Sequence, residues 1–139
     1  AKSQSEANIA RVDFFRKNLE DEQKIVSTNF GQAPISVLVS GENGQGRDVV
    51  EVTYKYAEID REAFATYPIK SNQEAINQLK NGDYWPAFDV AQNSVVIRKM
   101  YLAYLEPFTL TNYMQPIFVF EGDDGFVAYI PAITSKYLE

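Results

Sequence analysis

The sequence contains no cysteine and no histidine in 139 residues. Without cysteine the chain has no disulfide, no thiolate nucleophile and no sulfur-ligated zinc site. Without histidine it lacks the commonest general base and transition-metal ligand, and every Ser-His-Asp triad is excluded. Any catalysis would need carboxylates, lysine or tyrosine. We therefore expect a protein that is not an enzyme, with no catalytic residues, no metal site and no cofactor.

Membrane and nucleic-acid signals are also missing. No apolar run reaches the roughly 18 residues that suggest a transmembrane helix, and no signal-like segment occurs. The 13 basic residues are scattered and outnumbered by 19 acidic ones, which gives a net charge of −6. Nucleic-acid affinity comes mainly from clustered lysine and arginine, so we expect no nucleic-acid partner. The chain begins without methionine, and we expect a mature or trimmed piece that has lost an N-terminal signal or anchor.

What the sequence does contain is apolar and aromatic residues, at 45% and 14%. That composition indicates a folded chain, and its length favours one domain with its own core. Residues 3–21 are predicted to form a first helix that packs on a sheet. Ser3 and Glu6 fit a capping box, and apolar residues follow at steps of three, three and four, at Ile9, Val12, Phe15 and Leu19.

Alternating apolar and polar residues predict two strands, at 33–40 and 48–58. The glycine-rich segment 41–47 between them lacks the spacing of a phosphate-binding loop and favours a flexible hairpin connection. Residues 64–70 are a candidate third strand, which Pro68 would place at a sheet edge.

A second helix is predicted over 71–81, with Ser71 and Glu74 as a capping box and Asn81-Gly82 as a stop signal. Residues 83–93 read as an aromatic-rich loop. A strand that is apolar on both faces follows and should be central; we expect one of its faces to carry Val95, Ile97, Tyr101, Ala103 and Leu105.

The last predicted elements are the strands 116–121 and 126–133, joined as a hairpin through Gly122–Gly125. The acidic residues Glu121, Asp123 and Asp124 near this turn suggest either a solvated hairpin tip or a calcium site. The predicted fold class is α+β, with an antiparallel sheet packed against two helices. Within a single domain over 1–139, the elements suggest two helix-plus-meander halves, at about 3–70 and 71–133.

Four short motifs carry a resemblance to a known family. Ala75-x-x-x-Leu79-x-x-Gly82 precedes Tyr101-Leu102-Ala103-Tyr104, and the runs Gln115–Phe120 and Tyr129–Ala132 follow. Over about 71–133 the chain resembles PepSY-like extracytoplasmic domains, especially the YycH and YycI type of bacterial envelope regulators. The resemblance implies a PepSY- or cystatin-like fold outside the cytoplasmic membrane, anchored by an N-terminal span that lies outside this sequence. It also implies a regulatory role through contact with a partner protein, such as a sensor kinase or peptidase.

Candidate binding residues lie in the two segments that flank the central strand. They are Tyr84, Trp85, Phe88, Phe108 and Tyr113. Tryptophan and tyrosine in loops are typical binding anchors, although such residues also cover the end of a sheet as a small apolar cluster. We expect a non-catalytic binding or regulatory module. The alternative is a glycan-binding or hydrolase-associated domain, which would need a carboxylate pair drawn from Asp89, Glu106 and Glu121.

Overall fold

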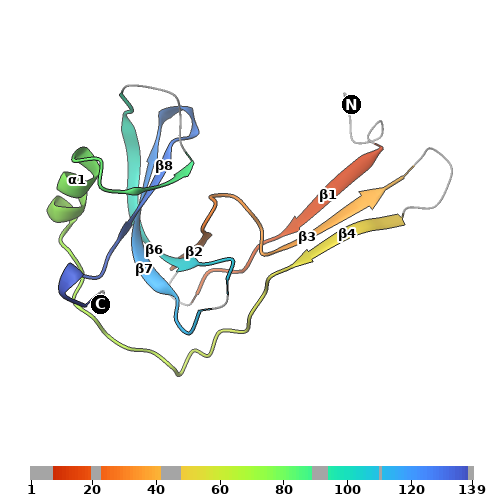
Figure 1. Cartoon of the computed structure of the whole chain (residues 1–139), viewed down its shortest axis with the longest axis horizontal. Coiled ribbons are helices and arrows are strands. Elements are labelled where there is room, and N and C mark those ends of the chain that lie inside the picture. The colour runs from red at the N-terminus through yellow and green to blue at the C-terminus, as the bar shows by residue number, and fades with distance from the viewer. Residues whose placement is uncertain (1–7, 20–22, 42–47, 89–93, 110, 138–139) are drawn as a thin grey trace. The chain divides into compact units, whose positions relative to one another are not determined.

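The computed structural model describes residues 8–19, 23–41, 48–88, 94–109 and 111–137 (Figure 1). The chain divides into two compact units, one built from Ala1–Arg16 and Ala33–Glu58 and the other from Lys17–Gln32 and Ile59–Glu139. Each unit contains its own sheet, because three strands of the first unit and five strands of the second pair only among themselves in the described residues.

The first unit is a three-stranded antiparallel sheet. Its strands are β1 (Ile9–Phe14), β3 (Ile35–Ser40) and β4 (Asp48–Tyr54), with β3 in the middle. The alternation of apolar and polar residues correctly predicts β3 and β4 as strands. The connection over 42–47, predicted as a flexible loop, lies outside the described residues.

The predicted first helix over 3–21 is wrong. Residues 9–14 form β1, in register with β3 from Ile9 opposite Ser40 to Phe14 opposite Ile35. In a segment this short, apolar residues at Ile9 and Val12 fit a helical stripe, whereas Ala10, Val12 and Phe14 fit a strand equally well. Pairing with β3 decides between the two periods, and a single-segment pattern carries no information about that pairing.

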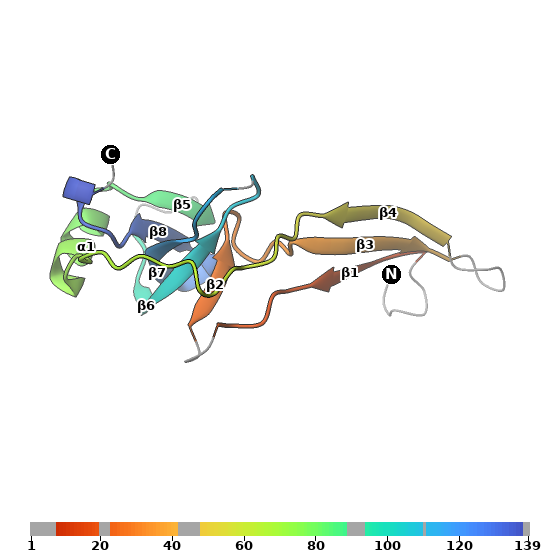
Figure 2. The ribbon, with the colours of Figure 1, turned by 90° about the horizontal axis from the view of Figure 1, so that it is seen from below.

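The second unit contains a curled five-stranded sheet, a half-barrel in the order β2-β6-β7-β8-β5. Figure 2 shows the strands in this order. All neighbours are antiparallel except β2 and β6, which are parallel. The strand bounds are β2 Lys24–Ser27, β5 Trp85–Phe88, β6 Ile97–Glu106, β7 Gln115–Gly122 and β8 Val127–Pro131.

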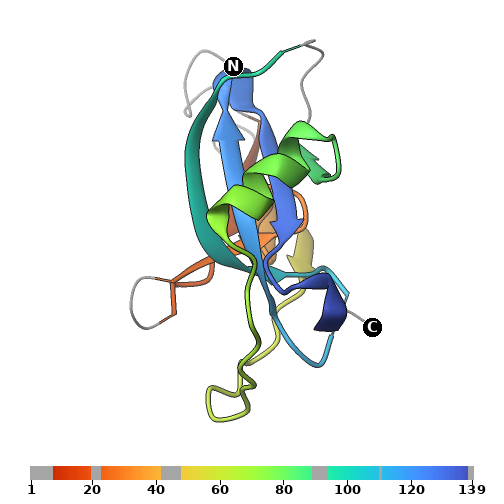
Figure 3. The same ribbon diagram turned by 90° about the vertical axis from the view of Figure 1, so that its left-hand side faces the viewer.

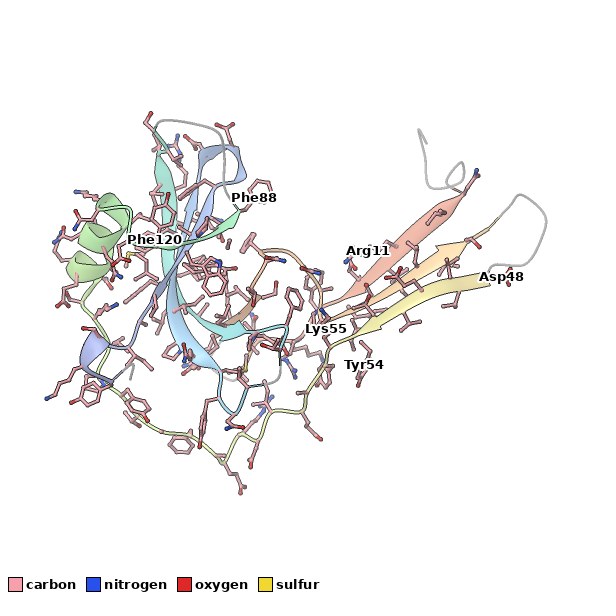
Figure 4. The ribbon with its side chains drawn as sticks, viewed as in Figure 1. Arg11, Asp48, Tyr54, Lys55, Phe88 and Phe120 are labelled. Atoms are coloured by element: carbon pink, nitrogen blue, oxygen red, sulfur yellow. The ribbon has the colours of Figure 1, made fainter. Side chains whose placement is uncertain are left out.

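Helix α1 (Asn72–Lys80) covers one face of this sheet (Figure 3). The predicted capping box is confirmed: Glu74 N–H donates to the Ser71 hydroxyl, and Ser71 N–H donates to the Glu74 carboxylate at 2.7 Å. The predicted stop is confirmed by Asn81 at the C-cap and by Gly82 at φ 78°. Ala75 of α1 is fully buried against a core that includes Phe120 (Figure 4), together with Phe118, Phe126, Ala128, Ile130 and Ala132.

The other face of the five-stranded sheet is the inside of the curl. Tyr129, on β8, donates from its hydroxyl to the carbonyl oxygen of Ser27, on β2, at 3.0 Å. Strands in a flat sheet lie about 4.8 Å apart, so β8 and β2, three positions apart, would be separated by roughly 14 Å. No tyrosine side chain spans that distance, and the sheet therefore curls toward the face that carries Tyr129. This inner face buries Ala103, Ile117, Val119, Val127 and Tyr129.

A β-bulge in β6 changes which side chains share a face. The register with β7 shifts between Ile97 and Lys99. Ile97 packs with Met100 on the helix side, whereas Tyr101 packs on the inner face. The prediction that Ile97 and Tyr101 share a face is therefore wrong, because the extra residue at the bulge inverts the alternation. The prediction that this strand lies inside the sheet is confirmed, because β6 pairs with β2 on one side and with β7 on the other.

The predicted α+β class with two helices is also wrong. Of the described residues, 45% are in strands and 13% in helices, and they contain one α-helix, α1. The remaining helical residues are short 3₁₀ turns at Asp123–Gly125 and Ser135–Tyr137. The candidate strand over 64–70 is reduced to one isolated bridge between Ile69 and Ile133. The C-terminal hairpin β7–β8 is confirmed, with Asp124 and Gly125 in the left-handed region at φ 56° and 83°.

Candidate docking surface

The register of the three-stranded sheet places only apolar residues on one of its faces. Paired residues of adjacent strands point to the same side of a sheet. Val12, Val37 and Val52 form one row across the three strands. Neighbouring rows add Phe14, Ile35 and Tyr54 at one end and Ala10, Val39 and Val49 at the other, so the face consists of these nine residues. We call it the apolar face.

Most of this face is open to solvent. The exposed fraction is 45% for Val12, 52% for Phe14, 63% for Val49, 58% for Val52 and 66% for Tyr54. Apolar residues scattered singly are normal on protein surfaces, whereas these residues are contiguous and are a candidate for an interaction site. Three strands also need an apolar face that is covered if the sheet is to be stable alone.

The opposite face of the same sheet is mainly polar. Arg11 and Asp13 form an ion pair on it at 2.7 Å, and Thr53 donates to Glu51 at 3.4 Å. Figure 4 labels Arg11 on β1 and Tyr54 on β4, and the register places Arg11 on the polar face and Tyr54 on the apolar one. The face as a whole carries Ile9, Arg11, Asp13, Ser36, Leu38, Ser40, Asp48, Glu51 and Thr53.

The Arg16 side chain links the segment that follows β1 to the segment that follows β4. The Arg16 guanidinium lies 4.0 Å from the centre of the Tyr56 ring and donates to the Ala57 carbonyl oxygen at 2.5 Å. Tyr56 in turn packs against Tyr54, with ring centres 6.3 Å apart. The backbone N–H of Lys55 donates to the Pro34 carbonyl oxygen at 2.8 Å. These contacts hold the segments that leave β1 and β4 beside one another. They therefore fix the positions of the side chains at the end of the apolar face that contains Tyr54.

Three of the five predicted binding residues lie on or beside β5. Tyr84 packs edge-on against Phe126, with ring centres 5.8 Å apart, and belongs to the core beneath α1. Trp85 and Phe88 are 55% and 54% exposed and lie on the edge strand, in register with Tyr129 and Val127. An edge strand accommodates Pro86, which is why a segment predicted as a loop forms a strand.

The other two predicted residues lie at the far end of the second sheet. Phe108 is half-buried and Tyr113 is 67% exposed, and both belong to the connection between β6 and β7. Phe88 is in register near the opposite end of β7, which is eight residues long. At about 3.4 Å per residue, the start of β7 lies roughly 14 Å along the sheet from the position of Trp85 and roughly 20 Å from that of Phe88. The structure therefore does not bring the five residues together as one site.

The acidic residues of the hairpin bind partners within the chain. Arg98 donates to both carboxylate oxygens of Asp123, at 2.7 and 2.9 Å, and this lowers the pKa of Asp123 and raises that of Arg98. Glu121 accepts from the Tyr101 hydroxyl at 2.6 Å and lies 3.8 Å from the Lys99 ammonium. No group of three acidic side chains placed to hold a metal ion occurs among the described residues.

Of the carboxylates considered for glycan hydrolysis, Glu106 and Glu121 do not lie together as a pair. Glu121 pairs in register with Lys99, seven residues along β6 from Glu106. Seven residues along a strand span roughly 24 Å, beyond the roughly 5–10 Å that glycoside hydrolysis needs. Asp89 lies outside the described residues.

In the described residues, every helix is too short or too polar to cross a bilayer. The apolar face does not follow from the sequence pattern, because the helix predicted at 3–21 would cover β3 and β4. Its signal was nevertheless present in the alternation of Ile35, Val37 and Val39 and in that of Val52 and Tyr54.

Comparison with known proteins finds no match to this chain, whether among family models, curated proteins or solved structures.

Proposed function

We propose that this chain is a non-catalytic binding module that contacts a partner protein through the apolar face of β1, β3 and β4. The observation that carries this proposal is the set of nine uncharged, apolar side chains on one side of a sheet, five of them at least 45% exposed. Burial of such side chains against a partner removes apolar surface from water, which is the main favourable term in most protein association.

The proposal is tested by photo-crosslinking at matched positions. A photoreactive phenylalanine analogue replaces Tyr54 on the apolar face or Arg11 on the polar face, and cells that express the full chain are irradiated. We expect crosslinked adducts from position 54 only, and we expect the additional substitution Val52→Lys to remove them. Equal adducts from both positions, or none from position 54, would contradict a docking role for this face.

The resemblance to PepSY-like domains supports a setting for this contact. We propose that the chain works outside the cytoplasmic membrane of a bacterial cell, held by an N-terminal anchor, and that it regulates a sensor kinase or peptidase there. This part of the proposal depends on the residue patterns over 71–133 alone. Fractionation of cells that express the full-length protein tests it, and recovery in the cytoplasmic fraction would refute it.

A second candidate function is favoured by Trp85 and Phe88. Both rings are more than half exposed on the same edge strand, and an exposed tryptophan offers a flat apolar surface on which a sugar ring can stack. Trp85 is the only tryptophan in the sequence, so its fluorescence reports on this strand directly. Titration with soluble cell-wall oligosaccharides should change that emission if the chain binds glycans. Unchanged emission up to millimolar ligand would exclude this alternative.

A further inference from the structure

We infer that the occupant of the apolar face is a second copy of this chain, so that two three-stranded sheets pack face to face across a twofold axis. This inference rests on the proposed function of the face as a docking surface and names its partner. It follows from three properties of the face, which are its charge, the distribution of side-chain size along it and its area.

The charge pattern favours a copy over a charged partner. None of the nine residues of the apolar face is ionisable near neutral pH, so two copies that meet there bring no like charges together. The polar face carries Arg11, Asp13, Asp48 and Glu51, and the whole chain has a net charge of −6. A basic partner would find its complement on the polar face, and two polar faces would repel one another.

The distribution of size along the face fits a twofold axis that follows the row of Val12, Val37 and Val52. The row on one side of this axis holds large side chains (Phe14, Ile35 and Tyr54), and the row on the other side holds smaller ones (Ala10, Val39 and Val49). Rotation about that axis places the large end of one copy over the small end of the other. Sheets that pack face to face lie about 10 Å apart, and facing large and small side chains fill that layer.

The area is sufficient for a weak dimer. A fully exposed aromatic residue has a surface of roughly 150–250 Å², and a valine somewhat less. With their exposed fractions, the exposed surface of Val12, Phe14, Val49, Val52 and Tyr54 adds up to about 500 Å². Two copies would then bury about 1,000 Å², the lower limit for a specific interface. We therefore expect a dimer whose population depends on concentration in the micromolar range or above.

The absence of cysteine allows a direct test. Val52→Cys places a unique thiol on the apolar face, and Glu51→Cys places one on the polar face of the same strand. The alkylation rate of each full-length variant is measured from dilute to concentrated protein. We expect the rate at position 52 to fall about tenfold once nine-tenths of the chain is dimeric, while the rate at position 51 stays constant. Circular dichroism confirms that both variants fold.

Sedimentation supplies an independent measurement. Val52→Lys should raise the dimer Kd by at least about 100-fold, since each interface would bury two uncompensated ammonium groups. Thr53→Lys adds the same charge to the polar face of β4 and should leave Kd within about threefold. These two variants keep the test valid if a cysteine variant folds poorly.

Each other result overturns the inference in a distinguishable way. Constant, fast alkylation at position 52 excludes a second copy but leaves the face as a docking surface for a different protein. Protection at position 52 that persists at every dilution means that the chain covers its own face, which refutes the proposed function as well. Equal protection of positions 51 and 52 at high concentration indicates association through strand edges instead.

Discussion

Removal of one hydroxyl group tests the curl of the five-stranded sheet. Tyr129→Phe keeps the ring, which is 2% exposed, and deletes only the donor to the Ser27 carbonyl oxygen. A hydrogen bond contributes about 0.5–1.5 kcal/mol net, and an acceptor left without its partner away from bulk water adds to the loss. We expect the free energy of unfolding of the second unit to fall by about 1–2 kcal/mol.

Trp85 provides the assay, because it is the only tryptophan and is in register with Tyr129 on the neighbouring strand. Its emission in a urea titration follows the second unit, and the dependence on urea should keep its slope if the folded structure is retained. Tyr113→Phe is the matched control, since Tyr113 is 67% exposed, and we expect its effect to stay within about 0.5 kcal/mol. If Tyr129→Phe unfolds at the same urea concentration as this control, the contact between β8 and β2 does not hold the curl.

Three further predictions concern the helix cap, a close contact and alkaline pH. Ser71→Ala removes the capping box and should lower the stability of the second unit by about 1 kcal/mol, measured by the same urea titration; no loss would contradict the cap. Gly122→Ala places a methyl group 2.5 Å from a Val95 side-chain carbon and should cost about 1–3 kcal/mol, part of which Val95→Ala should restore. Burial raises the pKa of both Tyr101 and Tyr129 above the ordinary 10.0. The hydrogen bond from Tyr101 to Glu121 raises the pKa of Tyr101 further, and the negative charge of Glu121 does the same for Tyr129. The folded state thus keeps protons that the unfolded chain loses, so stability should decline as pH rises above 10, and less steeply in Tyr129→Phe; equal declines would refute this.

The elements that could be predicted from the sequence are those with local signals. The capping box of Ser71 and Glu74 and the stop at Asn81-Gly82 mark α1 at both ends, because capping is chemistry between neighbours in the chain. The strands β3, β4, β7 and β8 carry clear alternation or a turn with left-handed positions. Their presence follows from side-chain pattern alone.

The elements that could not be predicted depend on distant partners. The apolar residues of β1 fit the period of a helix as well as that of a strand, and pairing with β3 makes this segment a strand. β2 is four residues long and exists through its parallel pairing with residues 103–106 of β6. The bulge in β6 has no marker such as glycine, and it alone places Ile97 and Tyr101 on different faces.

The candidate site was hidden by the error at residues 3–21. A helix there would have covered the apolar residues of β3 and β4, and their alternation therefore indicated nothing beyond an ordinary core. Once residues 9–14 form a third strand, they add Ala10, Val12 and Phe14 to the same face and leave it uncovered. The proposed docking surface therefore exists because residues 9–14 form a strand and not a helix.

The order in which the chain visits its two units has a consequence for dissection. The chain enters the second unit at Lys17, returns to the first at Ala33 and enters the second again at Ile59. A fragment that starts at Ile59 therefore loses an edge strand and the carbonyl group that Tyr129 binds. Truncation of the gene therefore cannot separate the two units cleanly. During synthesis, β2 can pair with β6 only after the ribosome has added β6, some eighty residues later in the chain.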